Sequence, residues 1–189
     1  HNLENISDYD SNARHKLLLE VCMAAKYEGD LIKTHYTQHQ LTNKGSQLCT
    51  VLARSFADIG DIIRGKDLFY GNTQEKEKRD ELENKLKEIF GNIYEELKKD
   101  NDNAALQARY KDTTNFYELR EDWWTANRHT VWEAITCDVK SGSQYFRQTC
   151  GKNDTRTGED CRCTKPNADQ VPTYFDYVPQ YLRWFEEWA

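Results

Sequence analysis

Apolar residues recur at three- and four-residue steps over four long stretches of this 189-residue chain, and no stretch alternates convincingly in the manner of a β-strand. The stepped pattern is typical of amphipathic helices, which we predict over residues 12–36, 46–65, 73–99 and 116–136. Gly29 interrupts the first of them, so a kink or a break is expected there. The sequence therefore predicts an all-α fold.

Residues at the ends of the predicted helices support these bounds. Gly65 is well placed to end the second helix, because glycine readily adopts the left-handed backbone of a helix C-terminus. Asn72, with Glu75 three residues later, has the pattern of a capping box at the start of the third. Since the connections between the main helices are short, we expect neighbours to pack antiparallel in a helical bundle.

Six cysteines accompany the predicted helices. They are Cys22, Cys49, Cys137, Cys150, Cys161 and Cys163. Three of them fall within residues 138–178, where the helical period disappears and Gly, Thr and Asn accumulate. This segment is predicted to be a long loop held by disulfides, which form in secreted and cell-surface proteins.

Zinc binding is the alternative use of these thiols. The conceivable four-thiolate site consists of Cys137, Cys150, Cys161 and Cys163. No C-x-x-C pair occurs, and Cys161 and Cys163 are too close in sequence to bond comfortably to each other. The spacing therefore favours disulfides to distant partners over zinc.

Composition limits the possible classes of protein. Aromatic residues make up 12% of the chain, which argues against disorder even though 31% of residues are charged. The formal net charge of −6 disfavours nucleic acid as the main partner. No stretch approaches the roughly 18 apolar residues of a membrane span. The chain begins at His1, and a predicted last helix after Pro179 has an apolar face that stops at Ala189. We therefore interpret the chain as part of a longer protein and expect any membrane anchor to lie outside it.

Few residues suggest chemistry. His35 and His39 have the spacing of two metal ligands on one helix face, but without the glutamate of an H-E-x-x-H pattern a solvated helix end is the better interpretation. His129 is interpreted as a surface residue. No phosphate-binding loop, nucleophile elbow or metal motif is present, so no cofactor is expected and the chain is predicted not to be an enzyme.

Acidic and aromatic side chains are predicted to have structural roles. The acids of the second helix and its exit each have a cation nearby, which predicts ion pairs rather than acid–base chemistry; they are Asp58, Asp61 and Asp67, with Arg64 and Lys66. The three tryptophans of the fourth helix, Trp123, Trp124 and Trp132, have core spacing and are predicted to be buried.

Four ordered motifs carry a resemblance to a known family. They are AAKYEGDL at residues 24–31, ARSFADIGDIIRGKD at 53–67, WWTANRHTVW at 123–132 and VPQYLRWFEEW at 178–188. Together they resemble the Duffy-binding-like domain of malaria parasites, in its alpha class, which occurs near the N-terminus of the variant surface antigen erythrocyte membrane protein 1 of Plasmodium falciparum. The resemblance covers essentially the whole chain.

The resemblance implies a place in a larger domain. A complete domain of this family has three subdomains, and residues 1–178 resemble the second, a helical bundle with a cystine-rich loop at 138–178. Residues 179–189 would begin the third. In the Asp-Ile-Gly-Asp run, Asp58, Gly60 and Asp61 are expected to fix close helix packing and to pair with cations such as Arg128.

A cystine pattern is also expected for this fold. Cys22 and Cys137 lie in helices whose apolar faces should meet, so we expect them to bond to each other. Cys49 and Cys150 would then join Cys161 and Cys163, in an order that the sequence leaves open.

The function implied by the resemblance is adhesion. The parent protein of such a domain lies on the outer face of the infected erythrocyte membrane, binds receptors of host erythrocytes or endothelium, and meets host antibodies. For the alpha class the implied ligands are heparan-sulfate-like glycans, blood-group sugars or complement receptor. The candidate glycan-binding cations are Arg14, Lys16, Lys26, Lys33, Lys44, Arg54, Arg64 and Lys66. The rival interpretations are a scaffold that displays variable epitopes while neighbouring domains adhere, and a secreted hydrolase on a helical frame, for which the sequence offers no cleft of acids or His.

Overall fold

The computed structural model describes residues 12–40, 48–67, 72–100, 103–139 and 143–183. Its helices are α1 (Ala13–Gln40), α2 (Leu48–Arg64), α3 (Thr73–Asp100), α4 (Asn103–Arg109) and α5 (Tyr117–Ile135). Two short 3-10 turns follow, η1 (Phe175–Tyr177) and η2 (Gln180–Leu182). Within these residues the only β-type pairing is two isolated bridges, so the all-α prediction is confirmed.

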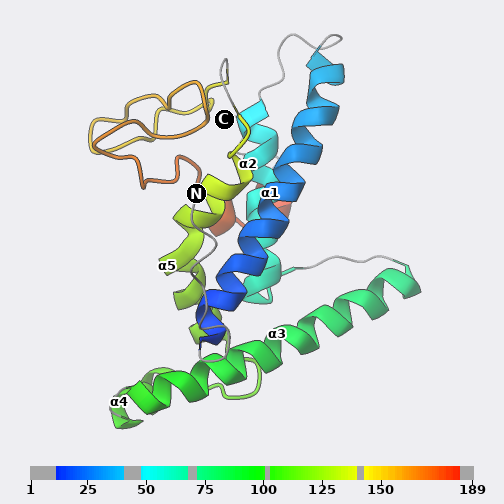
Figure 1. The fold of residues 1–189 in the computed structure, drawn as a ribbon, viewed down its shortest axis with the longest axis vertical. Helices are drawn as coiled ribbons and strands as arrows, with labels where there is room; N and C mark the ends of the chain where they lie inside the picture. Colours follow the sequence, from blue (N-terminus) through cyan, green and yellow to red (C-terminus); the bar gives the residue numbers. More distant parts are fainter. Residues whose placement is uncertain (1–11, 41–47, 68–71, 101–102, 140–142, 184–189) are drawn as a thin grey trace.

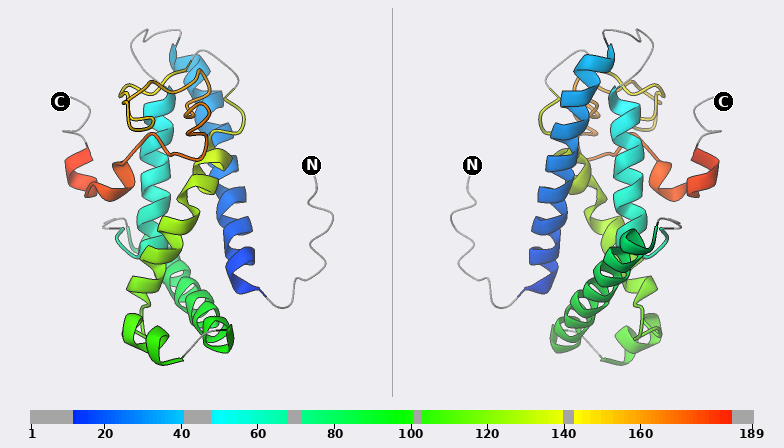
Figure 2. Two further views of the ribbon diagram at one scale, coloured as in Figure 1. Left: turned by 90° about the vertical axis from the view of Figure 1, so that its left-hand side faces the viewer. Right: turned by 90° about the vertical axis from the view of Figure 1, so that its right-hand side faces the viewer.

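Three helices form the bundle. α5 packs against both α1 and α2, α3 crosses one end with its N-terminal half extending away, and the loop after α5 lies at the other end (Figure 1). The turned views in Figure 2 show α1 and α2 side by side. α1 and α2 are antiparallel as expected, whereas α5 runs parallel to α1 because α3 and α4 intervene between α2 and α5.

The predicted helix ends are close to those observed. Asn72 and Glu75 form the expected capping box, each backbone N–H donating to the other's side chain at 3.0 Å. Gly65 ends α2 with φ of +70°. The short helix α4 was not predicted, because residues 103–109 carry only a weak apolar pattern.

The predicted interruption at Gly29 is wrong, since α1 is continuous through it. Gly29 is instead a contact point, where a Cβ atom would clash with the backbone oxygen of Ile135 in α5. Close approach of two helices therefore explains the glycine.

We expect Gly29→Ala to lower the free energy of unfolding by roughly 1–3 kcal/mol, because the new methyl group would push α1 away from backbone that cannot move aside. Urea unfolding followed by circular dichroism measures the change. Gly91→Ala in α3 is the control, since a Cβ there meets nothing nearer than 3.7 Å and alanine favours the helix. A loss at Gly29 no larger than at Gly91 would contradict the close contact.

Aromatic side chains fill the bundle. Trp124 and Trp132 of α5 flank Phe56 of α2, with ring centroids 5.1 and 5.3 Å from that of Phe56. Trp123 packs edge-on against Phe90 of α3. All three tryptophans are buried, as predicted.

The loop after α5 is fastened by two disulfides, Cys49–Cys161 and Cys150–Cys163. The first joins the loop to the start of α2. Three of the four thiols of the alternative zinc site are thus consumed, which rules that site out.

The expected Cys22–Cys137 bond is absent, and both thiols are free. The parallel register of α1 and α5 explains this. Ile135 contacts Gly29 of α1, and the backbone oxygen of Asp138 accepts a hydrogen bond from Lys33. Lys33 lies eleven residues beyond Cys22 in α1. At 1.5 Å per residue Cys137 lies about 15 Å along α1 from Cys22, far beyond disulfide reach. Burial, with the Glu133 carboxylate nearby, raises the pKa of Cys22 to about 11.

Candidate functional site

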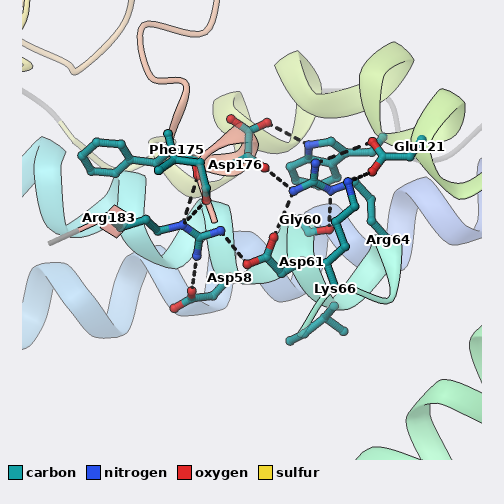
Figure 3. Close-up of polar contacts among 12 residues, drawn as sticks. Asp58, Gly60, Asp61, Arg64, Lys66, Glu121, Phe175, Asp176 and Arg183 are labelled. Carbon is teal, nitrogen blue, oxygen red and sulfur yellow. Dashed lines mark hydrogen bonds and ion pairs between the residues drawn. The ribbon is translucent and has the colours of Figure 1, made fainter. Parts of the chain in front are cut away.

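Ionic side chains from three parts of the chain meet beside the bundle (Figure 3). We call them the arginine–aspartate network: Asp58, Asp61 and Arg64 of α2, Arg128 of α5, and Asp176 and Arg183 of the C-terminal segment. Arg64, Asp61, Asp176 and Arg183 are buried. Such charges are tolerated away from water only when they are paired and hydrogen-bonded.

Asp176 is the centre of the network. Its carboxylate accepts hydrogen bonds from Nε and Nη2 of Arg128, each at 2.7 Å, and from Nε1 of Trp124 at 2.8 Å. Arg64 donates to the backbone oxygen of the same residue. This bidentate pair and the indole hold η1 against α2 and α5.

Arg183 fastens the end of the described chain to α2. Its guanidinium donates to Asp58 at 2.8 Å and to Asp61 at 2.5 Å, and also to the backbone oxygens of Phe175 and Val178. Arg64 reaches the other oxygen of Asp61 at 3.0 Å. Two arginines therefore share one buried carboxylate.

Burial raises the pKa of both Asp58 and Asp61, and the positive charge of Arg183 opposes the rise in each case. Their ionised forms thus depend on the arginine beside them.

These contacts refine the expected role of the Asp-Ile-Gly-Asp run. Gly60 does fix close packing, since a Cβ there would lie 2.7 Å from the Trp124 ring. The acids pair with cations as expected, but the partners are Arg183 and Arg64. Arg128 binds Asp176 instead. The expected pairing with Arg128 is therefore corrected.

A third buried arginine, outside this network, joins α2, α3 and α5. Arg120 is fully buried and donates to both oxygens of Glu83 and to the backbone oxygens of Ile62 and Ile63. It thereby satisfies carbonyls at the C-terminus of α2, where a cation is favoured by the helix dipole.

The structure places the candidate glycan-binding cations in different surroundings. Lys16 and Lys26 are exposed on α1. Lys66 is exposed but paired with Glu121. Arg14 and Arg54 are half-buried and have interactions of their own. Lys44 lies outside the described residues.

Two candidates have structural roles instead. Arg64 is 2% exposed and is held in the network, so it does not face solvent where a polysaccharide would bind. Lys33 is half-buried and donates to the backbone oxygen of Asp138 at 2.6 Å. The sequence could not separate these from Lys16 or Lys26, because all four lie on helices next to acids.

Three exposed cations were missed by sequence reasoning. Lys152, Arg156 and Lys165 lie on the disulfide-bonded loop. The Cys150–Cys163 bond draws the segments of Lys152 and Lys165 together, and Gly151 lies against Asn167. Only the disulfide pairing could have revealed this proximity.

The histidine pair gains no support as a metal site. His35 is exposed, and the side chain of His39 is outside the description. In the part of the chain that the structure describes, no group of three or more His, Cys, Asp or Glu side chains is placed to hold a metal ion. His129, predicted to lie at the surface, is half-buried beside Thr130.

The fold and the network define a disulfide-bonded helical domain in which the motif arginines and aspartates are structural. The model of the Duffy binding domain matches residues 1–183. The chain belongs to this family.

Two solved structures narrow the assignment of the chain within this family. The NTS-DBL1-alpha and CIDR-gamma double domain of PfEMP1 from the varO strain of Plasmodium falciparum is 40% identical over 92% of this chain and 24% of its own, with a TM-score of 0.68. The NTS-DBL1(alpha-1) domain of PfEMP1 from the same strain is 39% identical over 99% of this chain and 40% of its own, with a TM-score of 0.69. The chain is accordingly a Duffy-binding-like domain of the alpha class. It spans less than half the length of either solved chain.

No curated protein matches the chain. None of the helices among the described residues is both long enough and apolar enough to cross a membrane.

Proposed function

We propose that this domain mediates adhesion of infected erythrocytes to host cells, as part of a variant surface antigen on the outer face of the erythrocyte membrane. The observation that supports the proposal is that several arginines are buried in internal contacts, whereas other cations of the chain are exposed to solvent. The motif arginines Arg64, Arg128 and Arg183 are engaged inside the fold, as is Arg120 just before the third motif. Contacts with a receptor then belong to the exposed surface of the domain, where host antibodies would also bind.

A heparan-sulfate-like glycan is the ligand that we propose first. Lys16 and Lys26, together with the loop cations Lys152 and Lys165, are exposed ammonium groups on an otherwise acidic chain. Sulfates would bind them by charge, while the net charge of −6 would weaken the approach of any polyanion at low salt. Blood-group sugars and complement receptor are the other proposed ligands.

Residues 1–178 would act as the second subdomain of the full domain, and residues 179–189 as the start of the third. A second candidate function is a scaffold that presents variable epitopes while neighbouring domains adhere. The engagement of Arg64, Arg128 and Arg183 in internal contacts favours it.

Immobilised heparin and a salt series test the first proposal. We expect the chain to bind and to lose affinity steeply as salt rises, because salt screens exposed charge. Lys16→Glu with Lys26→Glu should weaken binding roughly tenfold or more, at about 1 kcal/mol for each charge contact removed.

Lys85→Glu is the control, since Lys85 is an exposed helical lysine that belongs to α3 and pairs with Glu81 of the same helix. If the chain does not bind and a longer chain with the flanking subdomains does, the scaffold function is the correct one. If neither binds, a glycan ligand is excluded for this variant.

A further inference from the structure

Two aspartates meet where the C-terminal end of α5 lies against α1. Asp30 belongs to α1, and Asp138 follows the end of α5 at Ile135 by three residues. Both are half-buried, and their side chains are hydrogen-bonded to each other. We call them the carboxyl pair. Gly29, next to Asp30, lies so close to Ile135 that a Cβ atom would clash with its backbone oxygen. The packing of the two helices therefore holds the carboxyl groups together.

A hydrogen bond between two carboxyl groups requires a proton. An ionised carboxylate can only accept hydrogen bonds, so one of the two groups must be protonated in order to donate. When both are ionised, this hydrogen bond is lost and two negative charges face each other. In agreement, the hydrogen bond with Asp138 raises the pKa of Asp30, and both desolvation and the negative charge of Asp138 add to the rise.

Two lysines of α1 act in the opposite direction. Lys26 and Lys33 lie about one turn before and after Asp30, and their positive charges lower its pKa without cancelling the rise. Lys33 also donates from Nζ to the backbone oxygen of Asp138 at 2.6 Å. Because a backbone carbonyl does not titrate, this hydrogen bond can persist whether the carboxyl pair is protonated or ionised.

We propose that the carboxyl pair is a proton-sensitive contact that fastens the start of the disulfide-bonded loop to α1. When the two groups share a proton, their hydrogen bond joins Asp138 to Asp30 across the helices. When both groups are ionised, repulsion opens this contact, and the hydrogen bond from Lys33 remains. The position where the chain leaves α5 and enters the loop is then less firmly held.

The sign of the pH effect follows from the linkage between protonation and folding. A carboxyl group whose pKa is higher in the folded chain takes up a proton on folding, so its contribution to stability is complete below the unfolded-state pKa and declines as the pH rises through the folded-state pKa. The carboxyl pair therefore favours the folded chain in acid.

Other aspartates also make stability depend on pH. Burial raises the pKa of Asp58 and Asp61, which gives them the same sign as the carboxyl pair. The backbone N–H of Asn115 lowers the pKa of Asp112, which gives the opposite sign. The carboxyl pair must therefore be measured as the difference between the wild-type chain and a variant at each pH.

Asp30→Asn tests the proposal, because a side-chain amide donates to the ionised Asp138 without needing a proton. At neutral pH the urea midpoint of the variant should exceed that of the wild type by about 0.2–0.5 M, as for one partly exposed pair. The difference should shrink as the pH falls towards about 4, where the wild-type pair regains its proton. Asp138→Asn should behave in the same way. Asp80→Asn is the control, since Asp80 is an exposed aspartate of α3, and its midpoint should follow that of the wild type at both pH values.

Two further measurements separate a shared proton from a merely structural effect. In an NMR titration of the carboxyl carbons, the pKa of Asp30 should lie above that of a free aspartate and should fall in Asp138→Asn but not in Asp80→Asn. The double variant of Asp30→Asn with Asp138→Asn should gain no more than either single variant, because removal of one charge already ends the repulsion. An unchanged pKa of Asp30 in Asp138→Asn overturns the proposal, as does a gain from Asp30→Asn that is equal at neutral and acid pH. Additive gains in the double variant also overturn it.

Discussion

Asp176→Ala is expected to lower the free energy of unfolding by about 3–5 kcal/mol. The side chain of Asp176 is completely buried and receives three hydrogen bonds, two from Arg128 and one from Trp124. Without it, the largely buried Arg128 guanidinium keeps its charge and loses its counter-ion, and the Trp124 N–H loses its acceptor. Removing one partner of a buried ion pair costs far more than the net contribution of the pair, because the other charge stays away from water.

Urea unfolding of the oxidised chain, followed by circular dichroism, measures this change. The control is Asp122→Ala, which removes a partly exposed ion pair with Arg109 and a hydrogen bond from the Tyr110 hydroxyl and should cost about 1–2 kcal/mol. Asp176→Asn keeps an acceptor for Trp124 and should fall between the two. An effect of Asp176→Ala no larger than that of Asp122→Ala would show that the network is not maintained in solution.

Removal of the Cys49–Cys161 disulfide, by Cys49→Ala with Cys161→Ala, should cost about 4–5 kcal/mol. The bond joins residues 112 positions apart and so restricts most of the unfolded chain. It also holds the loop against the bundle, where the backbone oxygen of Cys161 accepts a hydrogen bond from the Trp132 indole of α5 at 3.2 Å.

Cys150→Ala with Cys163→Ala is the internal comparison. That bond closes a separation of only 13 residues, so its loss should cost about 3 kcal/mol. Urea unfolding under non-reducing conditions measures both. The order of the two effects is the test: a larger loss from the short loop would mean that loop length does not govern the stabilisation.

Much of the helical structure could be predicted from local patterns. The capping box at Asn72 and Glu75 and the glycine end of α2 depend on neighbours within a few residues, and both were found as expected. The burial of Trp123, Trp124 and Trp132 followed from their spacing, because a helix shows which residues share a face. The four motifs likewise identified the family.

The candidate site was only partly predictable. That acids of α2 pair with cations was expected, but the choice of Arg183 over Arg128 was not. Asp58 and Arg183 are 125 residues apart, and nothing in either local sequence specifies the other. Arg64 and Lys66 likewise look alike in the sequence, yet one is buried in the network and the other is at the surface.

Local sequence alone determines where the helices lie, which faces are apolar and which family the chain belongs to, since these depend on the helical period and on short-range capping. The tertiary structure decides the rest. The parallel register of α1 and α5 separates Cys22 from Cys137 and turns Gly29 from an expected break into a contact. The six cysteines, and likewise the many arginines and aspartates, can be paired in numerous ways that agree equally well with the local sequence. Only the packing of α2, α5 and the C-terminal segment selects one, because a buried charge requires its partner within hydrogen-bond distance.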